Sequence, residues 1–489
     1  MEDTIAAIST PQGEGGIGVI RISGPGASDI IKEIFCPAGG KAIRELLPRH
    51  MYFGRITDNL TEAHKADNGC GGTDPAKHPL PALIDEAMVC YFPEPKSYTG
   101  EDVAEIQCHS SSVSLRKILS LVISKGARLA EPGEFTKRAF LNGRLDLSQA
   151  EAVMDLIKAR TDKTYEVALD QLEGSFSRGI RAIRADLTDI LVDMAVNIDY
   201  PDEDIEELTY EKLETGLRAA AGKIDRYLAT CGTGKILREG LKVSIIGKPN
   251  VGKSSLLNAL LREERAIVTE IAGTTRDTIE ETLSIDGLPV ILTDTAGIRD
   301  TDNVIEKIGV ERSKDAFNHA DLVIFTLDLS RPLDEEDLDI AEKLRGRKVI
   351  VFLNKEDMAE AVRRGEMQGI TQENIAGLKE LLPDAVFVEG SAREDRGLAE
   401  LRDCIKNIVY TDRGESQSAD IVTNVRHEKL LRDAKDSVTD AVALTESRQP
   451  LELIEIDVNT AYVSLGTIIG EETEGDIIDE VFRRFCLGK

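Results

Sequence analysis

The chain has 489 residues, more than one hydrophobic core usually serves, so we expect roughly two to four domains. Hydrophobic residues make up 41% and charged residues 30%, a balance that is typical of folded globular proteins and excludes a disordered chain. The formal net charge of −28 excludes nucleic-acid binding through the overall field of the protein, because such binding depends on basic side chains that neutralise phosphates. Any contact with RNA then requires a local basic patch or a basic partner protein.

Neither a membrane segment nor a targeting segment is expected. No apolar run approaches the roughly 18 residues that cross a bilayer, and Met1-Glu2-Asp3 carries acids where targeting segments carry bases. We therefore expect a cytoplasmic protein without membrane contact. The cysteines are scattered, odd in number and never spaced Cys-x-x-Cys, which predicts reduced thiols rather than a disulfide framework or a zinc site. They are Cys36, Cys70, Cys90, Cys108, Cys231, Cys404 and Cys486.

Residues 1–142 combine short β-type runs with glycine and proline punctuation. Two such runs are Val19–Ser23 and Ala87–Phe92. Mixed segments of this kind predict an α+β domain. Within it, residues 64–81 are polar, glycine-rich and without periodicity, which indicates a surface loop.

Residues 143–238 change to a helical period. Apolar residues spaced by three or four predict one stripe on a single long helix that ends before Pro201. They are Leu169, Leu172, Phe176, Ile180, Ile183, Leu187, Ile190 and Met194. A similar stripe within residues 412–489 consists of Val458, Ala461, Leu465, Ile468 and Ile469. Because neither block buries its stripe alone, we expect one discontinuous helical domain with the intervening segment as an insertion.

The inserted segment, residues 239–411, alternates buried-type strands with helical stretches. Strands are expected at Lys242–Ile246, Val290–Thr293, Leu322–Phe325, Val349–Leu353 and Val386–Val388. Apolar strands that alternate with helices predict a mostly parallel sheet covered on both faces. The chain as a whole is thus expected to be a multidomain α/β protein.

A phosphate-binding loop is predicted at Gly247–Ser254, directly after a predicted strand and before a helical run. Its glycines let backbone N–H groups point at phosphate oxygens. The Lys253 ammonium adds positive charge at the β- and γ-phosphates, and the Ser254 hydroxyl can ligate Mg²⁺. The segment therefore predicts a site for a nucleoside triphosphate.

Three further signals follow in an order that favours GTP. Asp294 would hold the magnesium shell, and the N–H of Gly297 would contact the γ-phosphate. An Asp carboxylate in Asn354–Asp357 would accept both N–H donors of guanine, whereas adenine would leave this carboxylate facing a lone pair, at a cost of kilocalories. Ser391-Ala392 would close over the base. Together these signals predict a GTPase.

Hydrolysis needs groups that these motifs lack. Ile298 stands where Ras-like proteins place a water-orienting glutamine, and its apolar side chain cannot orient water. The nearest acid-bearing segment is Arg299–Glu306. No arginine finger is identifiable, but a bound cation could supply its charge, and Asn250 offers a neutral oxygen ligand for one. The set resembles the translation-factor-like GTPases.

Several stretches outside these motifs form an unusual combination. They are Gly18–Gly24, Ser97–Asp102, Pro132–Leu147, Gln149–Ala152, Ile271–Asp277 and Phe485–Lys489. In them the chain resembles, essentially from end to end, the MnmE (TrmE) family of tRNA-modification GTPases. The resemblance implies an N-terminal folate-binding domain that dimerises, a helical domain built from both flanks, and an inserted Ras-like P-loop G domain.

The resemblance also implies roles in the G domain. A potassium ion would be the missing cation, and its ligands would be Asn250, Thr269, Ile271 and Thr274. Magnesium would be held by Ser254 and Thr275, and Glu306 would activate the water. A solvated acid at a helix start is the alternative for Glu306. The implied GTP contacts are Asn250, Val251, Gly252, Lys253, Ser254, Ser255, Thr269, Glu270, Ile271, Ala272, Gly273, Thr274, Thr275, Asp294, Thr295, Ala296, Gly297, Asn354, Lys355, Asp357, Ser391, Ala392 and Arg393.

A tetrahydrofolate derivative, in its 5-formyl or methylene form, is the second implied ligand. Its matching residues are Arg21, Glu105, Arg144 and Lys489. Arg21 and Lys489 would pair with the folate carboxylates, and Glu105 would accept pterin N–H donors. Cys486 would lie near the reactive carbon and joins Glu306 and Lys253 as a catalytic candidate; a semi-buried thiol is the alternative. The sequence departs from the family at Cys108–Ser111, where Gly-His-Gly-Gly is usual, and in the longer loop 64–81.

The function that the resemblance implies is tRNA modification. A homodimeric, potassium-stimulated GTPase would join an FAD-binding MnmG-family protein in a heterotetramer and add a carboxymethylaminomethyl-type group to C5 of the wobble uridine of certain tRNAs. One alternative is a ribosome-assembly GTPase, against which the folate-type domain and the lack of a basic appendix argue. A second alternative is a helical scaffold with a vestigial G domain, against which the intact motifs argue.

Overall fold

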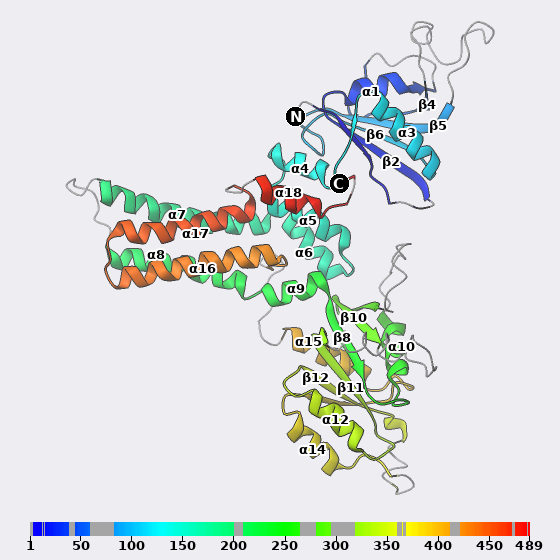
Figure 1. Cartoon of the computed structure of the whole chain (residues 1–489), viewed down its shortest axis with the longest axis vertical. Helices are drawn as coiled ribbons and strands as arrows, with labels where there is room; N and C mark the ends of the chain where they lie inside the picture. The colour runs from blue at the N-terminus through cyan, green and yellow to red at the C-terminus, as the bar shows by residue number, and fades with distance from the viewer. Residues whose placement is uncertain are drawn as a thin grey trace. The chain divides into compact units, whose positions relative to one another are not determined.

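The chain folds into two units, each with its own core, in the computed structural model of Figure 1. One unit comprises Met1–Met154 with Gly466–Lys489, and the other comprises Asp155–Leu465. The structure describes all residues except 1–2, 12, 14, 39–44, 59–82, 200–208, 265–279, 295–317, 359–363, 365–367, 411–420, 472–474 and 487. The predicted loop at 64–81 therefore lies outside the described residues.

A seven-stranded sheet forms most of the first unit, with the strand order β3-β4-β5-β6-β2-β1-β7. Neighbouring strands are antiparallel, except that β1 and β7 are parallel. The strands are β1 (Ile5–Ile8), β2 (Gly15–Ser23), β3 (Phe35–Pro37), β4 (Met51–Thr57), β5 (Leu83–Phe92), β6 (Val103–Ser110) and β7 (Arg128–Leu129). Because side chains alternate between the faces of a sheet, each strand presents a different row to each face.

Helices α1 (Ala27–Ile34) and α3 (Ser112–Ser124) cover one face of this sheet (Figure 1). Their apolar sides share a core with fully buried strand residues such as Ile20, Val89 and Ile106. The β-type runs predicted from the sequence lie within β2 and β5. The α+β expectation for this part of the chain is confirmed.

The end of the chain packs into the first unit. The helices involved are α4 (Glu134–Leu141), α5 (Leu147–Lys158) and α18 (Gly475–Arg483). Leu147 and Met154 of α5 share an apolar cluster with Phe482 and Phe485. Residues more than 300 positions apart in the sequence are therefore neighbours.

Long helices from both flanks of the insertion pack together in the second unit. They are α6 (Asp162–Leu172), α7 (Ser175–Asp199), α8 (Tyr210–Leu228), α9 (Cys231–Glu239), α16 (Val425–Glu446) and α17 (Leu451–Ile469). Helix α16 runs along α8, and the Arg184 guanidinium of α7 stacks 3.9 Å from the ring centroid of Tyr462 on α17 (Figure 1). The discontinuous helical arrangement predicted from the two apolar stripes is confirmed.

A six-stranded sheet lies between these flanks in sequence, with the order β13-β12-β11-β8-β10-β9. Its strands are β8 (Leu241–Ile246), β9 (Glu280–Ile285), β10 (Leu288–Asp294), β11 (Leu322–Asp328), β12 (Val349–Asn354) and β13 (Val386–Glu389). All neighbouring pairs are parallel except β9 and β10, which form an antiparallel hairpin. The mostly parallel sheet is confirmed, and every predicted strand of this segment is present.

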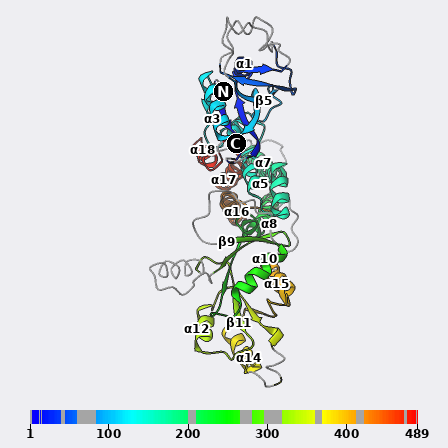
Figure 2. The ribbon, with the colours of Figure 1, turned by 90° about the vertical axis from the view of Figure 1, so that its right-hand side faces the viewer.

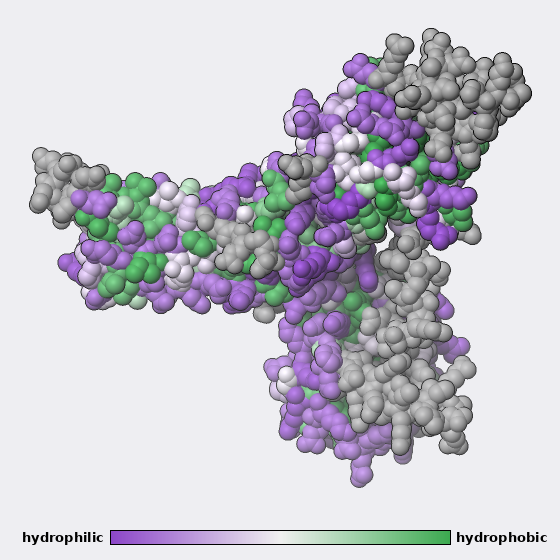
Figure 3. All heavy atoms as spheres, turned by 45° about the horizontal axis from the view of Figure 1, so that its top comes forward, coloured by the Kyte–Doolittle hydropathy of each residue, from purple (hydrophilic) through white to green (hydrophobic). Residues whose placement is uncertain are grey.

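Helices cover both faces of this sheet (Figure 2). They are α10 (Lys253–Glu264), α12 (Glu335–Lys343), α14 (Gln372–Leu381) and α15 (Leu398–Tyr410). Residues of α10 and α15 join one apolar cluster with the strands, and residues of α12 and α14 join another. Where this part is coloured in Figure 3, hydrophilic residues predominate on the visible face.

Three details differ from the sequence expectations. The stripe predicted on one long helix is divided between α6 and α7, because Gly174 takes a left-handed φ of 81° and ends the first helix. Strand β9 was not predicted. Cys36 is disulfide-bonded, whereas we expected a reduced thiol; the other cysteines that the structure describes, Cys90, Cys108, Cys231, Cys404 and Cys486, are free.

Within the described residues, no helix combines the length and the apolar character that a membrane span requires.

Candidate functional site

The phosphate-binding loop connects β8 to α10 in the second unit. Gly247 has a left-handed φ of 146°, and a Cβ there would lie 2.3 Å from the carbonyl oxygen of Thr326. A Cβ at Gly252 would lie 2.2 Å from Nδ2 of Asn354. Both positions exclude a side chain, so the loop backbone can approach a phosphate closely.

Lys253, Ser254 and Ser255 form the first turn of α10. The Lys253 ammonium donates to the carbonyl oxygens of Gly247 and Lys248, both over 2.8 Å, and so lies across the loop. Ser254 and Ser255 are exposed. Unpaired backbone N–H groups at a helix N-terminus favour a bound anion, so this turn suits the phosphates of a nucleotide.

Asn354 joins three predicted nucleotide segments. Its buried amide donates from Nδ2 to the carbonyl oxygen of Val251 over 2.8 Å and accepts the N–H of Ala392 at Oδ1 over 3.0 Å. Ser391 is buried beside Ala392, whereas Arg393 is exposed. The structure therefore brings together the phosphate-binding loop, the end of β12 and the loop after β13.

Asp357 carries a buried acceptor that nothing in the described residues satisfies. Its Oδ1 atom is shielded from solvent and has no hydrogen-bond partner. Leaving such an oxygen unpaired costs free energy unless a ligand supplies a donor. Guanine offers two N–H donors on one edge, whereas adenine offers a lone pair at the same place. The orphaned oxygen fits a guanine base.

Lys355, next in the same loop, is held by a residue that sequence reasoning missed. It has a left-handed φ of 67°, and its ammonium donates to Oδ2 of Asp328 over 2.6 Å. Burial alone would raise the pKa of Asp328, but hydrogen bonds from Lys355 and Ser330 hold this pKa below its ordinary value. Asp328 ends β11 directly opposite Asn354 on β12. A polar residue at the carboxyl end of a neighbouring parallel strand was the available signal.

Many predicted switch and catalytic residues lie outside the described residues. They are Thr269, Glu270, Ile271, Ala272, Gly273, Thr274, Thr275, Thr295, Ala296, Gly297 and Glu306. The backbone of Asp294 ends β10 in register with Ile245, near the start of the phosphate-binding loop. The structure therefore places this strand end at the nucleotide site.

Oxygen donors suited to hard cations are present in the described part of the site. No group of three or more His, Cys, Asp or Glu residues that could hold a metal occurs among the described residues. The Ser254 hydroxyl and the Asn250 amide are both in exposed residues, and Asn250 has a left-handed φ of 64°. Neutral oxygens of this kind suit Mg²⁺ and a monovalent cation, respectively, beside a triphosphate.

A second polar cluster lies in the first unit. Arg21 on β2 and Glu105 on β6 face each other across the sheet, with Nη2 and Oε1 2.9 Å apart. The Nη1 atom of Arg21 is buried without a hydrogen-bond partner among the described residues. That orphaned donor fits an anion or a carbonyl of a ligand. Arg21 and Glu105, both expected to contact the folate, are therefore brought together by the structure.

Tyr98 links Arg21 to Arg144. Each guanidinium carbon lies 4.9 Å from the centroid of the Tyr98 ring, and Nη1 of Arg144 donates to the Tyr98 carbonyl oxygen over 2.9 Å. The ring of Phe135 lies 5.8 Å from Arg21. Sequence reasoning quoted Tyr98 and Phe135 only as parts of motifs. The sequence feature that could have singled out Tyr98 is an aromatic residue inside a conformationally restricted, glycine-containing loop.

The last residues of the chain complete the cluster. The backbone N–H of Phe135 donates to the Lys489 carbonyl oxygen over 3.2 Å, and that of Gly133 donates to Cys486 over 3.3 Å. Gly488 has a left-handed φ of 88°, and a Cβ there would lie 2.4 Å from the Ile8 carbonyl oxygen. Burial and the nearby charge of Arg21 lower the pKa of the Lys489 ammonium.

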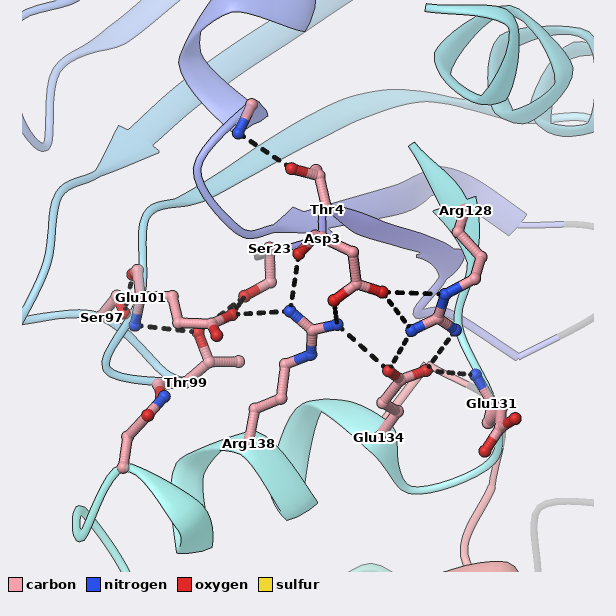
Figure 4. A network of polar contacts seen from close by, with 12 residues as sticks. Asp3, Thr4, Ser23, Ser97, Thr99, Glu101, Arg128, Glu131, Glu134 and Arg138 are labelled. Atoms are coloured by element: carbon pink, nitrogen blue, oxygen red, sulfur yellow. Dashed lines mark hydrogen bonds and ion pairs between the residues drawn. The ribbon is translucent and has the colours of Figure 1, made fainter. Parts of the chain in front are cut away.

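An ion network surrounds Arg138, a fully buried residue of α4 (Figure 4). Its guanidinium pairs with Glu101 over 3.0 Å, Glu134 over 3.2 Å and Asp3 over 2.8 Å. Arg128 pairs with both Asp3 and Glu134 over 2.6 Å. Since Glu101 and Glu134 stand close in sequence to Tyr98 and Phe135, the network fixes the segments that carry these rings.

Comparison with known proteins identifies the family to which the chain belongs. The family profile described as "GTP-binding protein TrmE N-terminus" matches residues 4–144, and that described as "MnmE helical domain" matches residues 147–486. Proteins named "tRNA modification GTPase MnmE" from Clostridioides difficile, Alkaliphilus oremlandii and Bacillus subtilis are 47%, 45% and 42% identical, and the alignments cover 100% of this chain and 100% of each relative.

Among solved structures, Aquifex aeolicus Era bound to GDP·AlF4⁻ is 28% identical over 40% of this chain and 65% of its own, with a TM-score of 0.27. So low a score carries no argument about the fold. The full-length sequence matches do carry an argument, because their alignments span every described element of both units. The chain belongs to the MnmE family of tRNA modification GTPases.

Proposed function

We propose that this GTPase takes part in adding a carboxymethylaminomethyl-type group to C5 of the wobble uridine of certain tRNAs. It would act in the cytoplasm in a heterotetramer with an FAD-binding MnmG-family protein. The supporting observation is the unpaired Nη1 atom of Arg21 beside Glu105, since GTP hydrolysis alone needs no second ligand cluster. The proposed domains are 1–142, 143–238, 239–411 and 412–489.

The test of this proposal is nucleoside analysis of tRNA. Deleting the gene from its host should remove the modified wobble uridine, and the intact gene should restore it. A deletion strain that keeps its full level of modified wobble uridine would refute the assignment, whatever the GTPase activity of the protein.

We propose Mg²⁺ and K⁺ as the cations of the GTPase site. Ser254 and Thr275 would hold Mg²⁺, and Asn250, Thr269, Ile271 and Thr274 would hold K⁺. Bound there, the two cations offset the negative charge that develops on the γ-phosphate, a task that an arginine finger performs in other GTPases. Lys253 orients the phosphates. Glu306 would orient the attacking water, because Ile298 cannot.

Hydrolysis rates in K⁺ and in Na⁺ test the cation. We expect much faster turnover in K⁺, and Asn250→Gly should lose that preference, because glycine tolerates the left-handed φ of 64° without supplying an oxygen ligand. Equal rates in the two salts for the unmodified protein would contradict the proposal. For Glu306→Ala, we expect GTP affinity near that of the unmodified protein and hydrolysis largely lost; normal hydrolysis would mean that another group orients the water.

We propose that the second cluster binds a tetrahydrofolate derivative carrying a one-carbon unit, in the 5-formyl or methylene form. The residues that bind the folate would be Arg21, Glu105, Arg144 and Lys489, and Cys486 would lie near its one-carbon unit. Calorimetry with 5-formyltetrahydrofolate should show binding that Arg21→Ala abolishes. Arg55→Ala is a matched control, because Arg55 forms a similar cross-strand pair with Glu86 on the same sheet. Equal loss in both variants would contradict the assignment.

We propose a homodimer formed through the first unit. The support is a partly apolar row on the sheet face opposite α1 and α3: Phe53 pairs with Met88, Met88 with Gln107, and Gln107 with Val19. The side chains of Phe53 and Met88 are 55% and 41% exposed in the single chain. Burying such a row in a second copy would remove it from water. Phe53→Asp should yield a monomer by sedimentation; a dimer of unchanged affinity would place the contact elsewhere.

A further inference from the structure

The β9–β10 hairpin connects the nucleotide site to the helices of the second unit. At one end, Asp294 of β10 pairs in register with Ile245 of β8, just before the phosphate-binding loop. At the other end, Asp286 and Gly287 form the turn, with left-handed φ values of 49° and 84°. Two consecutive left-handed residues are the signature of a tight two-residue hairpin turn. Because β10 is hydrogen-bonded to β8 on one side and to β9 on the other, it resists bending.

The start of helix α6 holds the turn of this hairpin. The Thr161 hydroxyl donates to the carbonyl oxygen of Gly287 over 2.6 Å. The same hydroxyl caps α6 by accepting the N–H of Thr164 over 3.2 Å. One side chain therefore serves the first turn of a helix and the turn of the hairpin at once.

A second contact lies beside the first. The Arg160 guanidinium donates from Nη1 to the Thr282 hydroxyl of β9 over 2.8 Å. At the turn itself, a Cβ on Gly287 would lie only 3.0 Å from Cβ of Lys163. The turn and the beginning of α6 are therefore in close contact, with no room for a side chain between them.

Apolar side chains of the hairpin and of helices α6 and α9 also pack together at this junction. Val167 of α6 and Leu237 of α9 are 1% and 2% exposed, and both belong to the same apolar cluster as Leu283, Ile285 and Leu288 of the hairpin. Close-packed side chains transmit a displacement, because a gap would forfeit their contacts. We therefore expect the hairpin and the two helices to move together.

We propose that Thr161 and Arg160 are positioning residues that couple the nucleotide state to the helical part of the chain. Strand β10 spans about 20 Å between its carboxyl end at Asp294, beside the phosphate-binding loop, and the turn. A shift at Asp294 on exchange of GTP for GDP would displace the turn, and the turn would displace the cap of α6. Coupling between two sites is reciprocal, so the helices would in turn bias the choice of nucleotide. The proposal rests on the GTPase activity alone and not on folate or tRNA.

Substitutions of Thr161 can separate its two roles. Thr161→Asp keeps the helix cap, because a carboxylate accepts the N–H of Thr164, but it has no proton for the Gly287 carbonyl oxygen. Thr161→Ser keeps both bonds. Thr209→Asp is the matched control, because Thr209 caps α8 in the same way, by accepting the N–H of Lys212, and α8 is not the helix whose cap holds the hairpin turn.

Amide hydrogen exchange on the full chain provides the measurement, with either GDP or a non-hydrolysable GTP analogue bound. In the unmodified protein and in Thr161→Ser, deuterium uptake by α6 should differ between the two nucleotides. Thr161→Asp should lose this difference and change the ratio of GTP-analogue to GDP affinity about fivefold, the lower end for coupled sites. Thr209→Asp should change neither quantity. A merely structural role of Thr161 would alter uptake equally in both nucleotide states.

Two results would overturn the proposal. One is an α6 in the unmodified protein that exchanges identically with GDP and with the GTP analogue. The other is a Thr161→Asp protein that retains the full difference. If circular dichroism shows that Thr161→Asp does not fold, Thr282→Val removes the acceptor of Arg160 from the hairpin side without touching the cap. A nucleotide difference undiminished by Thr282→Val would then exclude the Arg160 contact as a coupling element.

Discussion

At the scale of single residues, we expect Asp357 to contribute most of the free energy that selects guanine over adenine. Its Oδ1 atom is buried and unpaired in the described structure, so the protein bears the cost of an unsatisfied acceptor until a base donates to it. Hydrogen bonds to charged groups contribute about 1.5–3 kcal/mol each. Guanine supplies two such donors, which explains why one carboxylate can discriminate between guanine and adenine.

Replacing Asp357 with asparagine should therefore change which base is bound. We expect the affinity for GDP to fall roughly 10- to 150-fold, in proportion to the loss of a charge-assisted bond. The new amide N–H should favour xanthosine diphosphate, which presents a carbonyl where guanine presents an amino group. Calorimetry with both nucleotides measures this change, and Glu356→Gln, which removes the neighbouring charge, serves as control. Unchanged GDP affinity in Asp357→Asn would exclude this carboxylate as the base reader.

Glu134 should make stability depend on pH. Burial opposes its charged form, but hydrogen bonds from Arg128, Glu131 and Arg138 lower its pKa below the ordinary 4.5. As the pH falls, the unfolded chain binds a proton at this position before the folded chain does. The contribution of Glu134 to stability is therefore complete well above pH 4.5 and is lost as the pH falls through the lowered pKa. Glu134→Gln should be about 3 kcal/mol less stable at neutral pH, because it leaves buried guanidinium groups underpaired.

Urea unfolding at several pH values tests this expectation. The gap in unfolding free energy between the unmodified protein and Glu134→Gln should narrow as the pH drops below about 4.5. Glu86→Gln, which removes a half-exposed carboxylate of the same sheet, should show no such gap. A gap that is independent of pH would mean that the network does not depend on the charge of Glu134.

Residues whose partner is a ligand could be proposed from the sequence, whereas residues whose partner is another side chain could not. Lys253 and Asp357 occur in motifs because phosphate and guanine impose a fixed spacing on the chain. Arg138 acts through neighbours that only folding brings together, so no local pattern marks it. Asp328 is marked only by its place at the carboxyl end of a parallel strand. Cys36 is a similar case, because the spacing of cysteines in sequence does not reveal which ones meet in space.

At the scale of elements, burial decided which strands could be predicted. The central strands of the six-stranded sheet are mostly apolar because helices cover both faces, and all were predicted. Strand β9 lies at the sheet edge and mixes polar with apolar residues, as Glu280-Glu281-Thr282-Leu283-Ser284-Ile285, so it did not stand out. The division between α6 and α7 was missed because their apolar stripe continues past Gly174.

Two glycines of the helical part should respond oppositely to the same substitution. Gly174 has a left-handed φ of 81°, so Gly174→Ala should cost about 1–2 kcal/mol. Gly222 lies within α8, and a Cβ there meets nothing within 4 Å, so Gly222→Ala should stabilise by about 1 kcal/mol. Denaturant unfolding measures both. Destabilisation by Gly222→Ala, or no effect of Gly174→Ala, would contradict the backbone geometry described here.

At the scale of the whole molecule, the two proposed ligand sites belong to different units. The nucleotide residues, from Gly247 to Arg393, lie within Asp155–Leu465, and the residues around Arg21 lie within the other unit. Sequence motifs could locate each cluster but could not show that Arg21 and Glu105 are paired, since they are 84 positions apart. Separate placement implies that each site can be disabled without damaging the other.

A pair of variants should therefore uncouple GTP hydrolysis from tRNA modification. Arg21→Ala should lose the wobble-uridine product but hydrolyse GTP at a rate within about twofold of that of the unmodified protein. A twofold change in rate is small, because about 1.4 kcal/mol of activation free energy corresponds to a tenfold change. Lys253→Ala should lose both activities, because it removes the charge that holds the phosphates. Purified protein, the MnmG-family partner and tRNA from a deletion strain allow both rates to be measured together. Arg55→Ala, with its exposed pair to Glu86, should retain both activities.

If Arg21→Ala instead lost GTP hydrolysis while remaining folded, the Arg21 cluster would belong to the GTPase reaction, and the proposal of an independent folate site would fail.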